Sequence, residues 1–205
     1  FDLSGFLNAT DLSVTQENIP VTTFSDAGPR RLVGNYDHAH ENTGFFDGTA
    51  AQIDAISAAL MASDADKYLA QMFGANVEGS IVYESIVALS GKPLSGANAG
   101  AVLLNQSFVG RGGLYRGQVL RNATVTGTGN GTGFNLGIST TPSVFAAVFR
   151  VFSGTFTSIT MKLQESSDDA AGDPYADIAG VASGSMVAPG VVFASTTATT
   201  EAWKR

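Results

Sequence analysis

Apolar and polar residues alternate along much of this chain, and that two-residue period largely decides its fold class. In residues 157–164 the apolar members Ile159, Met161 and Leu163 fall on one face, opposite Ser158, Thr160 and Lys162. Successive strand side chains point to opposite faces, so this pattern predicts a half-buried strand. Residues 80–89 and 143–152 are apolar on both faces, which favours strands covered on both sides. Further strand-like runs occur at 3–14, 19–24, 36–46, 68–73, 101–108, 117–125 and 186–194.

These runs predict a mainly β fold, a sandwich or barrel of about ten strands. Residues 153–155, Ser-Gly-Thr, are predicted to form a hairpin turn that joins the strands at 143–152 and 156–165. Only one stretch has a helical period. Thr49 and Gln52 form a capping box, and Ile53, Ile56 and Leu60 follow at helical spacing. We expect one flanking helix at 49–62 that packs onto a sheet through this apolar stripe.

A glycine-rich run at 126–133 divides the chain by composition. Such a run does not pack well, so it is predicted to be a linker or the tip of a long hairpin. The expected organisation is a β domain at 1–125 that carries the helix, followed by a C-terminal β region at 134–205. That region forms either a second small β unit or part of the same sandwich.

Charge and composition limit the possible partners. Only 14% of the residues are charged, against about 25% in a typical domain, while 44% are hydrophobic. That balance fits a protein that buries surface against copies of itself. The formal net charge of -7 argues against binding to nucleic-acid phosphates, which depends on Lys and Arg. No apolar run approaches the ~20 residues of a membrane span, and residues 1–5 do not resemble a signal peptide, so we expect no membrane partner.

No motif in the chain indicates catalysis or a cofactor. The glycine-rich run lacks the strand and helix context of a phosphate-binding loop, and no Gly-x-Ser-x-Gly elbow occurs. There is no cysteine, so disulfides and thiolate metal sites are excluded. His38 and His40 would share one strand face, but no third ligand stands close by. The acidic segment 165–177 lacks the EF-hand pattern and is better interpreted as a solvated hairpin loop.

The order of several short patterns resembles the N-terminal half of the major tail-tube proteins of long-tailed, siphovirus-type bacteriophages. An opening strand at 2–8 leads to a Thr-Thr-Phe-x-Asp turn at 22–26 and an Arg-x-x-x-Gly loop at 30–34. A Gly-Phe-Phe-Asp strand end at 44–47 then runs directly into the expected helix. Residues 153–169 with 175–178 are similar to a β module of phage tail and other virion proteins. These parts together span most of the chain and contain no catalytic residues.

The resemblance implies a structural virion protein that is not an enzyme. Its subunits would form hexameric rings that stack into the tail tube, with double-stranded DNA passing the lumen without specific binding during ejection. Partners would be other copies and the tail proteins at the tube ends, and the location would be the virion, or the host cytoplasm during assembly. The loop at 22–36 is the expected contact between rings, with Phe24, Asp26, Arg30 and Arg31 as inter-subunit contact residues.

Two other functions remain open at this point. A capsid decoration protein or tail-associated adhesin with a related β-sandwich would bind a shell or a host glycan instead of polymerising. A carbohydrate-active β-sandwich would take its carboxylates from the 165–177 loop. The sequence favours assembly, because that function accounts for the low charge and for the strands that are apolar on both faces.

Overall fold

The computed structural model describes residues 3, 5–22, 28–46, 53–63, 65–74, 77–96, 102–136, 145–196 and 203–204. These residues form strands and one helix, which confirms the mainly β fold with a single helix. The chain divides into two compact units, Phe1–Ala70 with Tyr83–Tyr115 and Gln71–Val82 with Arg116–Arg205. Compactness does not show which parts fold independently, so the division into 1–125, 126–133 and 134–205 stays a prediction.

The largest sheet has the strand order β1-β2-β6-β4-β3, and β5 pairs with β6 beside this path. The antiparallel β1–β2 register runs from Leu7 opposite Gly44 to Pro20 opposite Arg31. The β2–β6 register is shorter and runs from Phe45 opposite Leu103 to Ala39 opposite Val109. Strands β3, β4 and β6 continue from the first unit into the second. Their bounds are β1 Leu7–Pro20, β2 Arg31–Phe45, β3 Lys67–Met72, β4 Ile81–Gly91, β5 Leu94–Gly96 and β6 Val102–Gln118.

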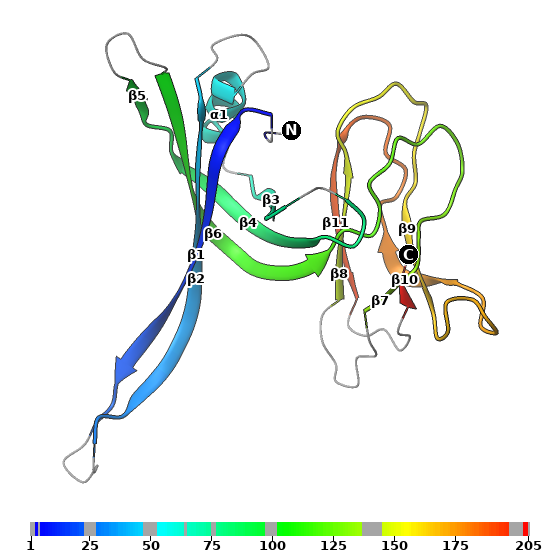
Figure 1. Ribbon diagram of the computed structural model, residues 1–205, viewed down its shortest axis with the longest axis horizontal. Coiled ribbons are helices and arrows are strands. Elements are labelled where there is room, and N and C mark those ends of the chain that lie inside the picture. The colour runs from blue at the N-terminus through cyan, green and yellow to red at the C-terminus, as the bar shows by residue number, and fades with distance from the viewer. Residues whose placement is uncertain are drawn as a thin grey trace. The chain divides into compact units, whose positions relative to one another are not determined.

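Helix α1 (Ile53–Met61) covers one end of this sheet, as Figure 1 shows. Ile53 and Ile56 are buried and Leu60 is half-buried, so the predicted apolar stripe does pack onto the sheet. The side chain of Ile53 reaches within 3.0 Å of the place where Gly44 would carry a Cβ, so glycine lets helix and sheet approach closely. The capping box at 49–52 lies outside the described residues. No helix in the described part of the chain is long and apolar enough to cross a membrane.

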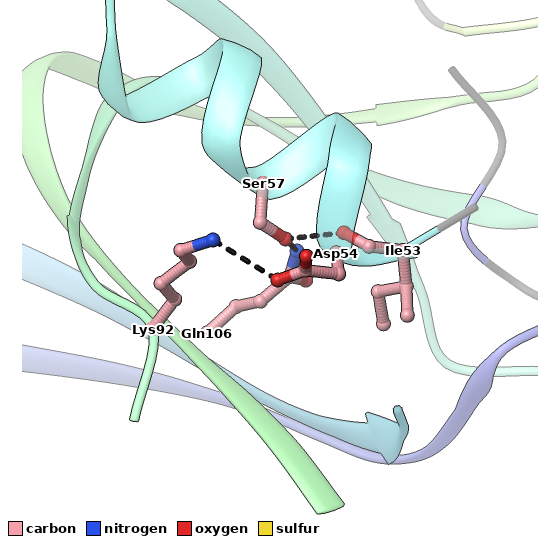
Figure 2. A network of polar contacts seen from close by, with 5 residues as sticks. All are labelled: Ile53, Asp54, Ser57, Lys92 and Gln106. Carbon is pink, nitrogen blue, oxygen red and sulfur yellow. Dashed lines mark hydrogen bonds and ion pairs between the residues drawn. The ribbon is translucent and has the colours of Figure 1, made fainter. Parts of the chain in front are cut away.

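Polar side chains fasten the helix to the sheet, as Figure 2 shows. The buried Gln106 of β6 donates its Nε2 hydrogen to Ser57 Oγ over 2.6 Å, and Ser57 Oγ donates to the carbonyl of Ile53 over 2.6 Å. At the helix N-terminus, Lys92 Nζ pairs with Asp54 Oδ1 at 3.0 Å. An acidic residue in the first helical turn also complements the helix dipole. These contacts specify one docking position for the helix.

The second unit contains two small antiparallel sheets. One has the order β10-β9-β12-β7 and the other pairs β11 with β8. Leu163, Ile178 and Val181 form its buried cluster, against which Ala147, Phe149 and Ala194 of the second sheet pack. The strands are β7 Phe134–Asn135, β8 Phe145–Val151, β9 Lys162–Ser166, β10 Ala176–Ala182, β11 Gly190–Thr196 and β12 Trp203–Lys204.

Three predictions about the strands are wrong, and the half-buried strand predicted at 157–164 begins only at Lys162, the first residue of β9. The hairpin at 153–155 does not form, because β8 pairs with β11 while β9 pairs with β10 and β12. Facing sheets let the apolar side chains of β8 pack against those of β9, which direct pairing in one sheet would prevent. The break expected between residues 14 and 19 is absent, since β1 continues through it. The strand predicted at 117–125 ends at Gln118, where β6 ends.

Candidate assembly surface

Strands β1 and β2 extend beyond the other strands of their sheet as a two-stranded hairpin, visible in Figure 1 at the end away from α1. Pairing of β2 with β6 ends at Ala39. Within the described part of the chain, residues 31–38 of β2 therefore pair only with β1. We call residues 14–22 and 28–38 the arm. Every described residue of the arm is exposed except the half-buried Gly34 and the buried His38. The arm therefore has no core of its own.

Large apolar side chains nevertheless lie on both faces of the arm. Ile19 is opposite Leu32 on one face, and these side chains are 44% and 59% exposed. Val33 lies opposite Asn18 on the other face and is 64% exposed. Paired residues of an antiparallel ladder point to the same side, so both faces present apolar surface. The exposed set is Val14, Ile19, Val21, Leu32, Val33 and Tyr36.

The arm keeps its backbone paired almost to the tip. The N–H of Val21 donates to the Arg30 carbonyl at 3.0 Å, and the N–H of Arg30 donates to Thr22 Oγ1 at 2.9 Å. A register shift between Gln16 and Asn18 inserts an extra residue opposite Glu17, as a β-bulge does. A two-stranded hairpin is marginally stable on its own in water, so an arm of this length gains order from a surface that covers it.

Two of the four predicted contact residues lie on the described part of the arm. Arg30 and Arg31 are both exposed and stand beside the tip, and Arg31 is paired with Pro20. Phe24 and Asp26 lie outside the described residues. The structure therefore brings Arg30 and Arg31 to one projecting element, while the contact role of all four stays a prediction.

Sequence reasoning missed the apolar residues of the arm, Ile19, Leu32 and Val33. The strands expected at 3–14 and 19–24 leave out residues 15–18, Thr-Gln-Glu-Asn, all of which are polar. Such a polar stretch can also belong to a strand that continues into a projecting hairpin, because there neither face meets the rest of its own chain. The available signal was that this polar stretch joins two apolar strand ends directly, which indicates one continuous strand.

The edge of the large sheet is a second unprotected surface. Strand β1 is the first in the strand order and pairs only with β2 in the described residues. Edge strands are usually blunted by lysine, proline or short length. β1 has 14 residues, lacks Lys and Arg, and has its proline only at its last position, Pro20. Its position at the end of the strand order therefore suits β1 to pairing with another chain.

Both histidines lie where the arm joins the sheet. The His38 and His40 rings have centroids 5.7 Å apart in an edge-on arrangement, and the side chains are 3% and 0% exposed. His40 Nε2 is hydrogen-bonded to Ser85 Oγ at 2.8 Å. The predicted sharing of one strand face is confirmed. Within the described residues no group of three or more metal-ligating side chains occurs, so the pair is not extended to a metal site there.

The acidic segment at 165–177 contains the connection between β9 and β10, as predicted for a hairpin loop. The backbone N–H of Asp173 donates to Asp168 Oδ1 at 3.1 Å and is the main cause that lowers the pKa of Asp168 below its ordinary value. The Lys162 ammonium lies 2.6 Å from Asp177 and lowers the pKa of that carboxyl, with help from Gln164. These carboxylates act as acceptors within the loop and its flanking strands.

Comparison with known proteins gives partial matches among solved structures. No protein-family model matches the chain, and no curated protein matches it. A chain in the virion of a native gene transfer agent particle matches with a TM-score of 0.45 and 15% identity, over 55% of this chain and 85% of that one. A chain in the tail of an empty gene transfer agent particle matches with a TM-score of 0.45 and 16% identity, over 56% and 90%. Likeness at this level assigns no function to this chain.

Proposed function

We propose that this chain is a structural subunit of a phage tail that polymerises through its arm into stacked rings. The observation that carries the proposal is a paired β hairpin without a core of its own, exposed nearly along its whole length and apolar on both faces. Large apolar side chains gathered on one projecting element are typical of an interaction surface. A second copy of the chain is the partner that low charge and an open sheet edge both favour.

The energy available from the arm favours a polymer over an isolated pair. Its six apolar side chains are about half exposed. Full burial of such a side chain contributes about 1.5–3 kcal/mol, so covering the exposed parts gives roughly 5–9 kcal/mol per arm. Association costs about 4–15 kcal/mol in lost freedom before any surplus remains. A single arm contact is therefore weak. In stacked rings each subunit would contact one neighbour with its own arm and be contacted by the arm of another, so several contacts form together.

The open edge at β1 supplies the second kind of contact. Pairing of β1 with a different edge of the next copy is a heterologous contact, and such contacts close into a ring when the rotation allows. We propose six subunits per ring and a continuous wall of strands around a lumen. The net charge of -7 suits a conduit for double-stranded DNA, because like charge keeps DNA from adhering to the wall. Assembly would take place in the host cytoplasm and end at other tail proteins.

Negative-stain microscopy with sedimentation velocity tests this function on the full chain. Tubes with a regular axial repeat are the expected product at high protein concentration. Compact monomers or trimers that adhere to capsids would instead favour the decoration or adhesin reading. A chain that stays monomeric at every concentration, with β1 and the arm protected internally, would refute self-assembly.

Charge reversal tests the arm itself. We expect Arg30→Glu with Arg31→Glu to block tube growth while the monomer keeps its circular dichroism spectrum, since both side chains are exposed. The matched control, Arg30→Lys with Arg31→Lys, keeps the charge and removes the bidentate geometry of arginine, so it should impair growth less. Normal polymerisation of the glutamate variant would remove Arg30 and Arg31 from the contact while leaving the remaining arm to be tested.

A further inference from the structure

The loop between β6 and β7, residues 119–133 of the second unit, contains the only Asn-Gly pair of the sequence, Asn130-Gly131. No residue of this loop belongs to a strand or a helix. One carboxylate nevertheless holds the loop at two points. Glu78 accepts the backbone N–H of Asn122 at 3.4 Å through Oε1 and the hydroxyl of Thr132 at 3.1 Å through Oε2. The Asn-Gly pair therefore lies in a loop whose two sides are joined.

A cation is bound directly to the peptide group of this pair. The guanidinium of Arg121 donates from Nη1 to the backbone carbonyl oxygen of Asn130, which belongs to the peptide that joins Asn130 to Gly131. Arg121 and Asn130 are both exposed. Within the described residues, neither the side-chain amide of Asn130 nor the backbone N–H of Gly131 has a hydrogen-bond partner. These two groups are therefore free to react with each other.

An asparagine that precedes glycine can lose its side-chain amide in water alone, because glycine has no Cβ to obstruct the approach of its nitrogen. The deprotonated nitrogen of Gly131 attacks Cγ of Asn130. The N–Cγ bond forms, the Cγ–Nδ2 bond breaks, and the amino group leaves as ammonia with a proton from water. The succinimide ring then adds water at either carbonyl carbon and gives aspartate or isoaspartate at position 130. One neutral amide becomes one carboxylate, so the formal net charge changes from -7 to -8.

Arg121 lies where negative charge develops in the first step. When the Gly131 nitrogen loses its proton, amide resonance spreads the charge onto the carbonyl oxygen of Asn130. A donor already aimed at developing charge lowers the barrier of a reaction, and a charged donor makes the stronger hydrogen bond. We propose that Asn130-Gly131 is a self-deamidating site whose first step is promoted by Arg121. This chemistry takes place within one chain and does not depend on assembly.

Mass spectrometry of the full chain, kept as a dilute monomer in mildly alkaline buffer, tests the site. The tryptic peptide 122–150 contains Asn122, Asn130 and Asn135, so the three side chains are compared within one fragment. Asn130 should gain one mass unit and form isoaspartate faster than the other two. Its rate in the folded chain should also equal or exceed its rate in concentrated urea, where the contact with Arg121 is lost. A rate no greater than that of Asn122 or Asn135, or a faster reaction in urea, would overturn the proposal.

Gly131→Ala tests the attacking atom. A Cβ at position 131 would meet nothing closer than Cδ of Arg121 at 3.5 Å, which is an ordinary contact, so the loop should be retained. The added methyl group obstructs the approach of the backbone nitrogen to Asn130, and deamidation should become several-fold slower. An unchanged rate would show that water attacks the side chain directly, which contradicts the proposed reaction.

Arginine variants test the promoting contact. Arg121→Met should slow deamidation of Asn130 about two- to fivefold in the folded chain, which is the effect that an exposed charged contact can supply. Arg121→Lys keeps a charged donor and should restore part of the rate. Arg116→Met is the matched control, since it removes an exposed arginine of β6 that has no hydrogen bond to Asn130. Equal rates in Arg121→Met and the wild type, the same slowing in Arg116→Met, or slowing that persists in urea would each refute the role of Arg121.

Discussion

Replacing Ile19 and Leu32 with threonine is expected to raise the subunit concentration at which assembly begins. The two side chains form a cross-strand pair on one face of the arm and are 44% and 59% exposed. Threonine keeps a β-branched side chain suited to a strand while removing most of the apolar surface. The change therefore alters the surface of the arm and leaves its backbone pairing in place.

The exposed fractions set the size of the effect. Full burial of a leucine or isoleucine side chain contributes about 1.5–3 kcal/mol, so covering the exposed parts of this pair contributes roughly 1.5–3 kcal/mol in total. A difference of 1.4 kcal/mol is tenfold in an equilibrium constant, so the threshold concentration should rise about 10- to 100-fold. The free energy of unfolding of the monomer should change by less than about 0.5 kcal/mol, because exposed positions contribute little to it.

Pelleting across a concentration series measures the threshold, and urea unfolding of the dilute monomer measures stability. Val187→Thr is the matched control, since Val187 is 72% exposed and lies in the second unit, away from the arm in sequence. That control should assemble at the wild-type threshold. An unchanged threshold in the arm variant, or an equal rise in the control, would refute the assignment of the arm as an assembly surface.

Two further predictions concern the two units separately. Ser57→Ala should lower the free energy of unfolding by about 1–3 kcal/mol, because it leaves the buried amide of Gln106 without its acceptor. Gln106→Met also removes the Oε1 that lacks a partner, so urea unfolding should show a smaller loss than for Ser57→Ala. Lys162→Met should raise the pKa of Asp177 toward its ordinary value, with Gln164 still holding it partly down, as measured by carboxyl NMR titration. A carboxyl whose pKa is lowered by folding stabilises the folded state at pH values above its ordinary pKa. This stabilisation is lost as the pH falls through the lowered pKa, so the variant and the wild type should be equally stable in strong acid.

The helix shows how far local patterns reach. Ile53 and Ile56 recur at helical spacing, and the structure buries both against the sheet. The alternation in residues 159–163 also survives, since Leu163 is buried and Lys162 is exposed. Each of these results depends only on residues a few positions apart, so the hydrophobic period and the secondary-structure propensity of the segment are enough to predict it. The placing of both histidines on one strand face was predictable for the same reason.

Partners distant in the chain were not predictable in this way. The strand predicted at 143–152 is present as β8, but it pairs with β11 and not with the strand predicted next in the chain. Both pairings satisfy the same local pattern, so the choice depends on which arrangement lets the side chains of β8 pack against Leu163. Likewise, nothing local shows that β2 continues beyond its pairing with β6, because the extent of strand pairing is a property of the whole sheet.

The sequence by itself therefore determined the mainly β class, the single helix and the acidic, weakly charged character of the chain. It also placed Arg30 and Arg31 in a segment expected to make contacts. Only the tertiary structure decided that this segment is a projecting arm with apolar faces and a pair of buried histidines at its root. The physical reason is that burial of a side chain depends on which strands lie beside it, and strand pairing brings together residues far apart in the chain.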